Sequence, residues 1–175
     1  ADAHHLFWDP VNNPHPWLAA SANIPFPYGD YSAIKRRYFP QDYFADAGEH
    51  QVVETVYVET EWDSNDPIGE SRFIHALAAR YGTPDAVVAP AWLDAGDAPQ
   101  VLAAQAGFAR VRSVRHKPGG PTHPNQVGRS HSLMSDQQWR RGYAELGRHG
   151  LHFDLQTPWW NLDGAGRLAR DFPNT

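Results

Sequence analysis

The first ten residues carry adjacent histidines in a segment whose composition fits a short strand. The chain begins Ala-Asp-Ala-His-His-Leu-Phe-Trp-Asp-Pro. Side chains alternate in an extended segment, which places Asp2, His4 and Leu6 on one face and His5 and Phe7 on the other. An imidazole near the end of a strand suits metal-assisted or acid–base hydrolysis, because its pKa lies near neutrality. His4 is therefore the first candidate for a general base or a metal ligand.

The composition predicts a single soluble domain. A chain of 175 residues with 41% hydrophobic residues is long enough to bury one core. The formal net charge of -5 and a sequence pI of about 6.0 argue against a nucleic-acid partner. The absence of cysteine excludes disulfides, thiolate metal sites and cysteine nucleophiles. No apolar run approaches the roughly 20 residues that span a bilayer, and the N-terminus lacks a signal-peptide pattern. We expect a cytoplasmic protein without a membrane partner.

Strand and helix patterns alternate along the chain, which positions the chemical groups. Strands are expected at the first residues and over 51–59, 86–90, 108–116 and 152–156, with helices over 42–48, 66–82 and 97–106, after Ser135, and after Asn161. Asp66 followed by proline predicts an N-terminal cap, and Gly82 predicts the end of that helix. Ser135 and Gln138 predict a capping box. Such alternation is typical of an α/β fold with a parallel sheet.

A long irregular segment separates the first two strands. It runs from about residue 8 to about residue 50 and interleaves six prolines, Pro10, Pro14, Pro16, Pro25, Pro27 and Pro40, with aromatic residues. Proline interrupts backbone hydrogen bonding, so neither a long helix nor a strand can run through most of the segment. Its length and aromatic content predict a packed lid rather than a linker.

The opening stretch resembles the amidohydrolase-2 family of the amidohydrolase superfamily. Members of the superfamily carry a His-x-His pair at the end of the first strand of a (β/α) TIM barrel, and here His4 takes the first position and Leu6 the second. The ends of the second and fourth expected strands, Tyr57-Val58-Glu59 and Arg115-His116, are similar to the same family. Its members include sugar lactonases, pyrone-dicarboxylate lactonase and metal-dependent decarboxylases.

The first strand–helix connection favours a barrel over an open nucleotide-binding sheet. An open sheet of that kind needs a glycine-rich turn after the first strand, whereas this chain has Leu-Phe-Trp-Asp-Pro there. A complete barrel has eight strands, and five strand–helix units are expected here. We therefore predict that residues 1–175 are the N-terminal part of a single amidohydrolase-like TIM-barrel domain, an incomplete barrel with a lid at about 8–50. Unpaired edge strands would promote aggregation, which supports a longer polypeptide.

Candidate site residues follow from the rule that TIM-barrel chemistry lies at the C-terminal ends of strands. Those ends supply His4, Glu59, Glu61, Trp92, Arg115, His116, Gln156, Trp159 and Trp160. His4 or His116 is the candidate general base, and Arg115 the group that stabilises negative charge or binds a carboxylate. A salt bridge to Glu59 or Glu61 is the alternative role for Arg115.

Substrate contacts are predicted from the remaining strand-end residues and the loops. Glu59 and Gln156 could bind hydroxyl groups of a sugar-like ring, and Trp92, Trp159 and Trp160 could form apolar walls. Packing in the core is the alternative for the last two. Arg129, with His123 and His131, could hold an anionic substrate, or these side chains could simply be solvated.

The resemblance implies one divalent metal, such as zinc, in the intact protein. Leucine cannot bind a metal, and Gln156 occupies the strand-five position where the superfamily often has histidine. We expect His4 to be the remaining ligand, further ligands to lie beyond Thr175, and the metal to be bound weakly or not at all.

Three functions remain open on the sequence. The first is hydrolysis of a small lactone or related cyclic ester by a water that a histidine activates. The second is metal-dependent decarboxylation, which needs a complete metal site. The third is a truncated or inactive barrel that only binds a ligand or partner. A small anionic or sugar-like substrate is expected, and the sequence leaves a homo-oligomer open.

Overall fold

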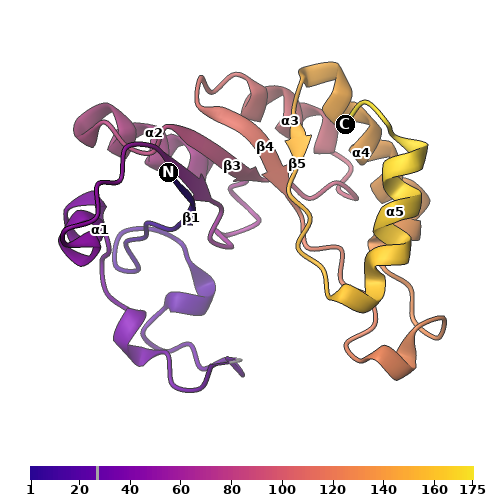
Figure 1. The fold of residues 1–175 in the computed structure, drawn as a ribbon, viewed down its shortest axis with the longest axis horizontal. Coiled ribbons are helices and arrows are strands. Elements are labelled where there is room, and N and C mark those ends of the chain that lie inside the picture. The colour runs from indigo at the N-terminus through magenta and orange to yellow at the C-terminus, as the bar shows by residue number, and fades with distance from the viewer. Residues whose placement is uncertain (27) are drawn as a thin grey trace. The chain divides into compact units, whose positions relative to one another are not determined.

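Five strands form one sheet in sequential order. The computed structural model describes residues 1–26 and 28–175 (Figure 1). The strands are β1 (Asp2–His5), β2 (Thr55–Val58), β3 (Ala86–Pro90), β4 (Val111–Arg115) and β5 (His152–Phe153), in the sheet order β1-β2-β3-β4-β5. The helices are α1 (Pro40–Ala47), α2 (Gly69–Tyr81), α3 (Ala98–Ala106), α4 (Gln137–His149) and α5 (Leu162–Asp171). This confirms the predicted α/β class with a parallel sheet.

The chain divides into two compact units, residues 1–87 and 88–175. In the first unit, β1 and β2 are parallel, with Asp2 opposite Thr55 and His5 opposite Tyr57. The predicted alternation holds from His4 onward, since His5 and the following Phe7 are buried while His4 is exposed, but it fails at Ala3, which is exposed as well. The buried face of β1 therefore supports the core, and the face that carries His4 remains available for chemistry.

The segment between β1 and α1 is packed by aromatic side chains, as predicted. Trp17 stacks on Phe26 with ring centroids 6.3 Å apart and lies 6.0 Å from Trp8. Two short 3-10 helices, Pro16–Leu18 and Ser32–Ile34, interrupt the irregular backbone. Of the prolines that marked this segment, Pro27 lies outside the described residues. None of the helices in the described part of the chain has the length and apolar character that crossing a bilayer requires.

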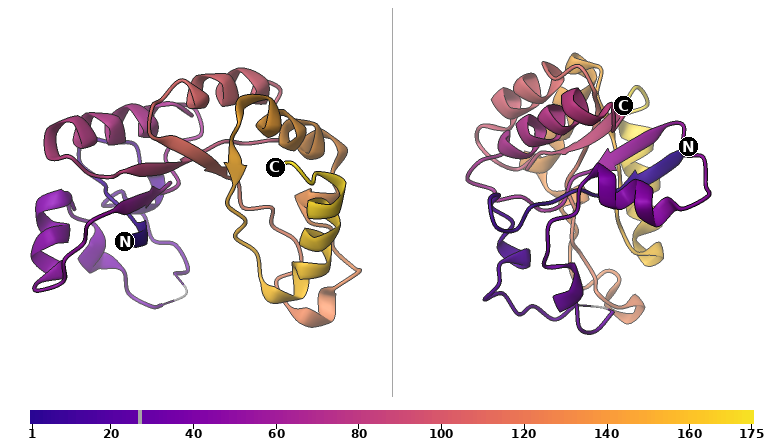
Figure 2. Two further views of the ribbon diagram at one scale, coloured as in Figure 1. Left: turned by 45° about the horizontal axis from the view of Figure 1, so that its top comes forward. Right: turned by 90° about the vertical axis from the view of Figure 1, so that its left-hand side faces the viewer.

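The second unit is built around Trp139, which is fully buried on α4. Its ring stacks on Tyr143 at 5.3 Å and meets Phe153 of β5 edge to face at 5.6 Å. Tyr143 in turn lies 5.1 Å from Phe172, directly after α5. Helix α3 packs beside α4 (Figure 2). Aromatic edge-to-face pairs add to the burial of apolar area, so this cluster holds α4 against β5 and against the end of α5.

Several predicted boundaries are wrong, each for a local reason. The second strand begins at Thr55, after four residues without regular structure, and the fourth begins at Val111, after a turn; both begin later than expected. The fifth strand ends at Phe153, so Gln156 lies in the loop beyond it. Such differences arise where residues with strand propensity find no ladder partner.

Two predicted helix caps are also wrong. Asp66 does not cap α2, because its carboxylate binds Arg72 at 2.9 Å and the helix begins after Ile68. The predicted capping box of Ser135 and Gln138 is replaced by Asp136, whose Oδ1 accepts from the Trp139 backbone N–H at 2.8 Å. Asp66 thus binds a side chain rather than the helix N-terminus, and in α4 the cap lies one residue later than predicted.

A glycine in α4 sets how closely this helix approaches the loop after β3. A Cβ atom placed on Gly142 would lie 2.0 Å from the carbonyl oxygen of Leu93. We predict that Gly142→Ala lowers the free energy of unfolding by about 2 kcal/mol, because overpacking costs more than the helix propensity of alanine returns. Urea titration measures this. Gly147→Ala on the same helix, with only one side-chain atom 3.9 Å away, is the control, and equal effects of the two changes would contradict the prediction.

Candidate active site

His4 extends from the exposed face of β1 and is held there through its backbone. Its N–H donates to Oδ1 of Asp2 at 3.0 Å, and Oδ2 of the same carboxylate accepts from the Tyr43 hydroxyl at 2.7 Å. These two hydrogen bonds lower the pKa of Asp2, with nearby histidines contributing. Asp2 thus remains ionised and ties β1 to α1. The His4 imidazole is exposed, as a group that exchanges protons with water must be.

The neighbouring His5 has a different character. It is 5% exposed, and both of its ring nitrogens lack a hydrogen-bond partner. Its ring lies 4.5 Å from Phe7 and 5.0 Å from Tyr43. Burial lowers the pKa of His5 to about 4, although Asp2 opposes this shift. His5 is therefore a neutral member of an aromatic core.

The C-terminal end of β2 brings Glu59 and Glu61 together as neighbours in a tight turn. The Glu59 carboxylate is 5% exposed, and its Oε2 accepts from the Glu61 backbone N–H at 2.8 Å. Glu61 has a φ of 58°, the only positive φ of a non-glycine residue in the described chain. A left-handed glutamate is uncommon and is held by its surroundings. The turn fixes Glu59, while the Glu61 side chain is exposed.

Behind this turn lies a buried carboxyl group that the sequence analysis missed. Glu70, near the start of α2, is 1% exposed. Its Oε1 accepts hydrogen bonds from the Tyr57 hydroxyl at 2.6 Å, the Thr60 backbone N–H at 2.6 Å and the Thr60 hydroxyl at 2.8 Å. The available signal was its spacing, because position 70 precedes Phe73 and Ile74 by one helical turn and so falls on the apolar stripe of α2.

In the second unit, His116 follows β4 and its ring orientation is fixed by two donors. Nδ1 accepts from the Leu93 backbone N–H at 3.1 Å and from Nε1 of Trp139 at 3.0 Å. Both partners can only donate, so Nδ1 carries the lone pair and the neutral ring carries its proton on Nε2. An Asp94 oxygen lies 3.9 Å from Nδ1. This arrangement equips His116 to donate through Nε2, whereas its one basic nitrogen is already engaged. Arg115, the residue before His116 and the last residue of β4, is buried.

The predicted substrate contacts lie at separate places. Trp92 is half-buried directly after β3, and Gln156 lines a hollow with Lys117 and Thr122. Trp159 is 69% exposed and meets Trp160 edge to face at 5.6 Å. The pair is therefore not packed into the core as a unit.

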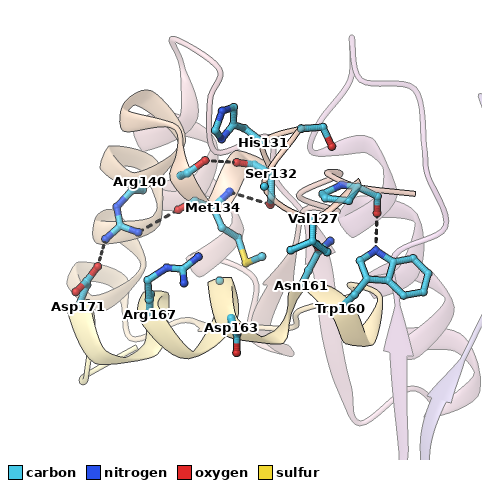
Figure 3. Close-up of a pocket in the computed structure, with 15 residues that line it drawn as sticks. Val127, His131, Ser132, Met134, Arg140, Trp160, Asn161, Asp163, Arg167 and Asp171 are labelled. Atoms are coloured by element: carbon cyan, nitrogen blue, oxygen red, sulfur yellow. Dashed lines mark hydrogen bonds and ion pairs between the residues drawn. The ribbon is translucent and has the colours of Figure 1, made fainter. Parts of the chain in front are cut away.

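A second hollow, of about 440 Å³, lies between the loop after β4 and helix α5 (Figure 3). Trp160 forms one wall, held by a 2.7 Å hydrogen bond from its Nε1 to the Pro121 carbonyl, and Met134 projects toward the middle. Arg140 binds Asp171 at 2.5 Å and the Met134 carbonyl at 3.0 Å. The volume is in the range of small-ligand pockets, but the Arg140 cation is already neutralised.

The loop residues predicted to hold an anion are exposed and differ in their surroundings. His131 lines the hollow of Figure 3. Arg129 does not line it, although Gly128 and Ser130 on either side of Arg129 do. Nδ1 of His123 accepts from the Asn125 backbone N–H at 3.3 Å, which makes this histidine a cap of a short 3-10 helix. His131 is thus the better placed of the three for a ligand in that hollow.

Comparison with known proteins identifies the family. A model of the amidohydrolase family matches residues 1–175. The chain belongs to the amidohydrolase family. It is 33% identical over 178 residues to the uncharacterized protein y4mH of Sinorhizobium fredii, with 99% of this chain and 58% of that protein aligned.

Solved amidohydrolases share the fold. An amidohydrolase from Burkholderia multivorans with bound HEPES superposes with a TM-score of 0.67 at 19% identity, covering 97% of this chain and 52% of the other. Amidohydrolase 2 from Bifidobacterium longum subsp. infantis gives 0.62 at 15% identity, covering 99% and 57%. The chain therefore spans somewhat more than half the length of these relatives. Their likeness supports the predicted TIM-barrel type of fold.

The donor set of this chain does not fit the metal that the amidohydrolase fold implies. No group of three or more histidine, aspartate or glutamate side chains within residues 1–26 and 28–175 could hold a metal ion. Leu6 is apolar on the face that carries His4, and both oxygens of Asp2 already accept hydrogen bonds. A catalytic zinc has three protein ligands as a rule. These residues therefore supply His4 alone on that face of β1.

We predict that Leu6→His strengthens zinc binding. Residues two apart on a strand lie roughly 6.6 Å apart on one face, so the new imidazole would stand beside His4. The expected gain is about tenfold in affinity, or roughly 1.4 kcal/mol, measured by calorimetric titration of the full-length protein with zinc chloride. The control is Val11→His, because Val11 is exposed, whereas a histidine at a buried position such as Leu18 would disturb the core. Equal zinc affinities for the two variants would refute the expectation.

Proposed function

We propose that the full-length protein hydrolyses a small lactone or related cyclic ester, with His4 as the general base. The observation that carries the proposal is membership of the amidohydrolase family over residues 1–175. The exposed imidazole of His4 can accept a proton from a water molecule while that water attacks the ring carbonyl carbon. The ring C–O bond then breaks, and the proton passes to the leaving oxygen, which gives a hydroxy acid.

His116 and Arg115 are assigned to the developing negative charge. The donors at Nδ1 of His116 leave Nε2–H as the hydrogen-bonding edge of the neutral ring. A fixed N–H donor stabilises an oxyanion better than water does, because it needs no reorientation during the reaction. Arg115 supplies a permanent positive charge for the same oxygen or for a substrate carboxylate. Of the two histidines predicted as base, His4 is therefore the one we propose.

The proposed substrate class rests on polar and aromatic residues that follow the strands or lie in the loops after them. Glu59 and Gln156 are proposed to bind ring hydroxyls, Trp92 and Trp159 to contact the apolar face of the ring, and Arg129 to attract an anion. A structural neighbour from Acinetobacter baumannii, described as a probable 2-pyrone-4,6-dicarboxylic acid hydrolase with citric acid bound, has a TM-score of 0.54 at 12% identity, covering 90% of this chain and 49% of the other. A 2-pyrone is a cyclic ester, which agrees with the proposed class.

The test is a substrate panel with the purified full-length protein. Acid release from five- and six-membered sugar lactones, a pyrone dicarboxylate and matched open-chain esters is followed with a pH indicator. Turnover of at least one lactone well above the spontaneous rate is expected. The panel also contains aromatic carboxylic acids, whose loss of carbon dioxide would favour the decarboxylase alternative. Ligand binding without turnover of any member would favour a barrel that only binds.

A further inference from the structure

The Glu70 carboxyl group connects three elements at the end of β2. The Tyr57 hydroxyl belongs to β2, Thr60 to the turn that follows it, and Glu70 to α2. The Thr60 hydroxyl also lies 2.8 Å from Nε2 of His15, in the segment between β1 and α1. The Thr60 carbonyl accepts from Nε1 of Trp17 at 2.8 Å. Every polar atom of Thr60 is therefore engaged, and Glu70 supplies the acceptor for two of them.

The polarity of this network follows from the donors. When the Thr60 hydroxyl donates to Glu70, it can only accept from His15, so the His15 ring carries its proton on Nε2. Burial keeps that ring neutral by lowering the pKa of His15 to about 4. Oε2 of Glu70 has no hydrogen-bond partner. A buried carboxyl oxygen without a partner costs stability, so its retention beside a strand end points to a role other than stability.

Thr60 is the residue between the two glutamates of the turn. Its N–H is bound by Glu70, and the next N–H, that of Glu61, binds Oε2 of Glu59. The residue that donates this second hydrogen bond, Glu61, has the left-handed conformation, which costs about 1 kcal/mol for a residue other than glycine. The hydrogen bonds of Thr60 hold the backbone directly before this strained residue. Glu70 therefore influences the orientation of the Glu59 carboxylate indirectly, through Thr60 and Glu61.

We propose that Glu70 is a positioning residue that holds the turn 59–61 so that the Glu59 carboxylate is oriented toward the substrate. The proposal rests on the proposed function for its consequence in catalysis, but the contact it invokes exists without substrate. Two independent observations support the proposal. Oε1 of Glu70 accepts three hydrogen bonds while its Oε2 has no partner, and the backbone of Glu61 is strained.

The charge state of Glu70 agrees with this role. Burial raises the pKa of Glu70 to about 7, Glu59 adds to the shift, and the hydrogen bonds from Tyr57 and Thr60 oppose it. The titratable groups around it are therefore Glu59 and Tyr57 on the β2 side and His15 through Thr60. Below pH 7 a protonated Glu70 places no charge beside Glu59. Above pH 7 the ionised Glu70 accepts the hydrogen bonds of Tyr57 and Thr60 more strongly, but the two carboxylates repel each other, which displaces the Glu59 carboxylate.

The experiment compares Glu70→Gln, Glu70→Leu and Ile74→Ala in the full-length protein. Glutamine is isosteric with the protonated acid and keeps one oxygen acceptor, whereas leucine leaves Tyr57 and Thr60 without one. Ile74 is fully buried on α2, so its truncation destabilises the helix without touching the network. For lactone hydrolysis, Glu70→Leu should raise KM about tenfold, with KM unchanged in Ile74→Ala despite a lower Tm. Glu70→Gln should keep the wild-type KM at pH 6 and abolish the rise in wild-type KM from pH 6 to pH 8.5.

Hydrogen exchange of the Glu61 amide gives a readout that needs no activity. Protection of that amide should fall at least tenfold in Glu70→Leu and persist in Glu70→Gln. If the wild type hydrolyses no lactone, the proposed function fails while the exchange result still decides the positioning role. Unchanged Glu61 protection in Glu70→Leu overturns the proposal outright. An unchanged KM in Glu70→Leu, with loss of Tm only, reduces Glu70 to a structural role and overturns it as well.

Discussion

Replacing His4 with asparagine in the full-length protein should lower kcat for lactone hydrolysis by about 10²- to 10⁴-fold, the usual contribution of a general base. Asparagine keeps a polar side chain of similar size but cannot accept a proton from water. The exposed position of His4 on β1 means that the substitution removes little packing. The free energy of unfolding should therefore change by less than about 0.5 kcal/mol, so the lost activity reflects chemistry.

The pH dependence of kcat distinguishes a base from a binding group. In the wild type, kcat should fall at acid pH as the base becomes protonated, and in His4→Asn the residual rate should lose that acid limb. His50→Asn, at an exposed histidine before β2, is the matched control and should keep both rate and profile. If His4→Asn retains the acid limb and more than about a third of the wild-type kcat, the base is another residue and the assignment fails.

His116→Gln tests the complementary assignment within the same assay. Glutamine retains a donor but cannot accept the hydrogen bonds of Leu93 and Trp139 in the same geometry. We expect a smaller loss of kcat than for His4→Asn and no loss of the acid limb, because a donor does not need to titrate. Loss of the limb in this variant would transfer the role of base to His116.

Local patterns were sufficient for the helices and for the buried strand β3. The predicted range 86–90 agrees with β3 to the residue, because an apolar run of this length between turn signals is too short for a helix. The end of the fifth strand was not predictable, since whether residues after Phe153 extend the ladder depends on the neighbouring strand. The same limit applies to the caps: Asp136 accepts from the Trp139 N–H, while the Ser135 hydroxyl donates to the Ser132 carbonyl instead of capping the helix.

The sequence predicts which residues follow the strands but not which groups those residues contact. The strand-end rule selects Glu59 and His116 as candidates, because each directly follows a strand of the sheet. It could not show that Nδ1 of His116 is engaged by Trp139, a residue 23 positions later in the chain. Nor could it find Glu70, since a glutamate in the first turn of a helix is ordinarily an exposed, dipole-stabilising residue. Contacts distant in sequence determine which nitrogen or oxygen is available for chemistry.

The stability of the protein should depend on pH through three buried groups, because two histidines and one glutamate change the free energy of unfolding in opposite directions. Burial lowers the pKa values of His5 and His15 to about 4 and raises that of Glu70 to about 7. An unfolded histidine titrates near 6.5, so between pH 6.5 and pH 4 the unfolded chain binds more protons at these two positions. Stability is then lost as the pH falls. Glu70 acts in reverse, because between pH 4.5 and pH 7 it is the folded state that keeps the proton.

From pH 7 to pH 5 each histidine should lower the free energy of unfolding by about 2 kcal/mol, and Glu70 should raise it by about 2 kcal/mol. The wild type should therefore lose only about 1 to 2 kcal/mol over this range. Glu70→Gln removes the opposing group and should lose about 4 kcal/mol. In His5→Phe one histidine and its two unpartnered nitrogens are replaced by an aromatic ring, so the dependence should nearly vanish. Urea titrations followed by tryptophan fluorescence at pH 5, 6 and 7 measure all three.

The order of the three slopes is the decisive result, because it does not depend on the absolute stability of any variant. Glu70→Gln must be the steepest and His5→Phe the flattest. Asp2, whose pKa is lowered, exerts its effect below its usual value near 3.8 and so outside this range. Equal slopes for wild type and Glu70→Gln would mean that Glu70 is ionised in the folded protein at pH 5. A carboxylate at that site would then repel Glu59 at every pH of the assay, and the rise of KM expected between pH 6 and pH 8.5 would have no physical cause. The stability and kinetic measurements therefore test the same protonation state by independent routes.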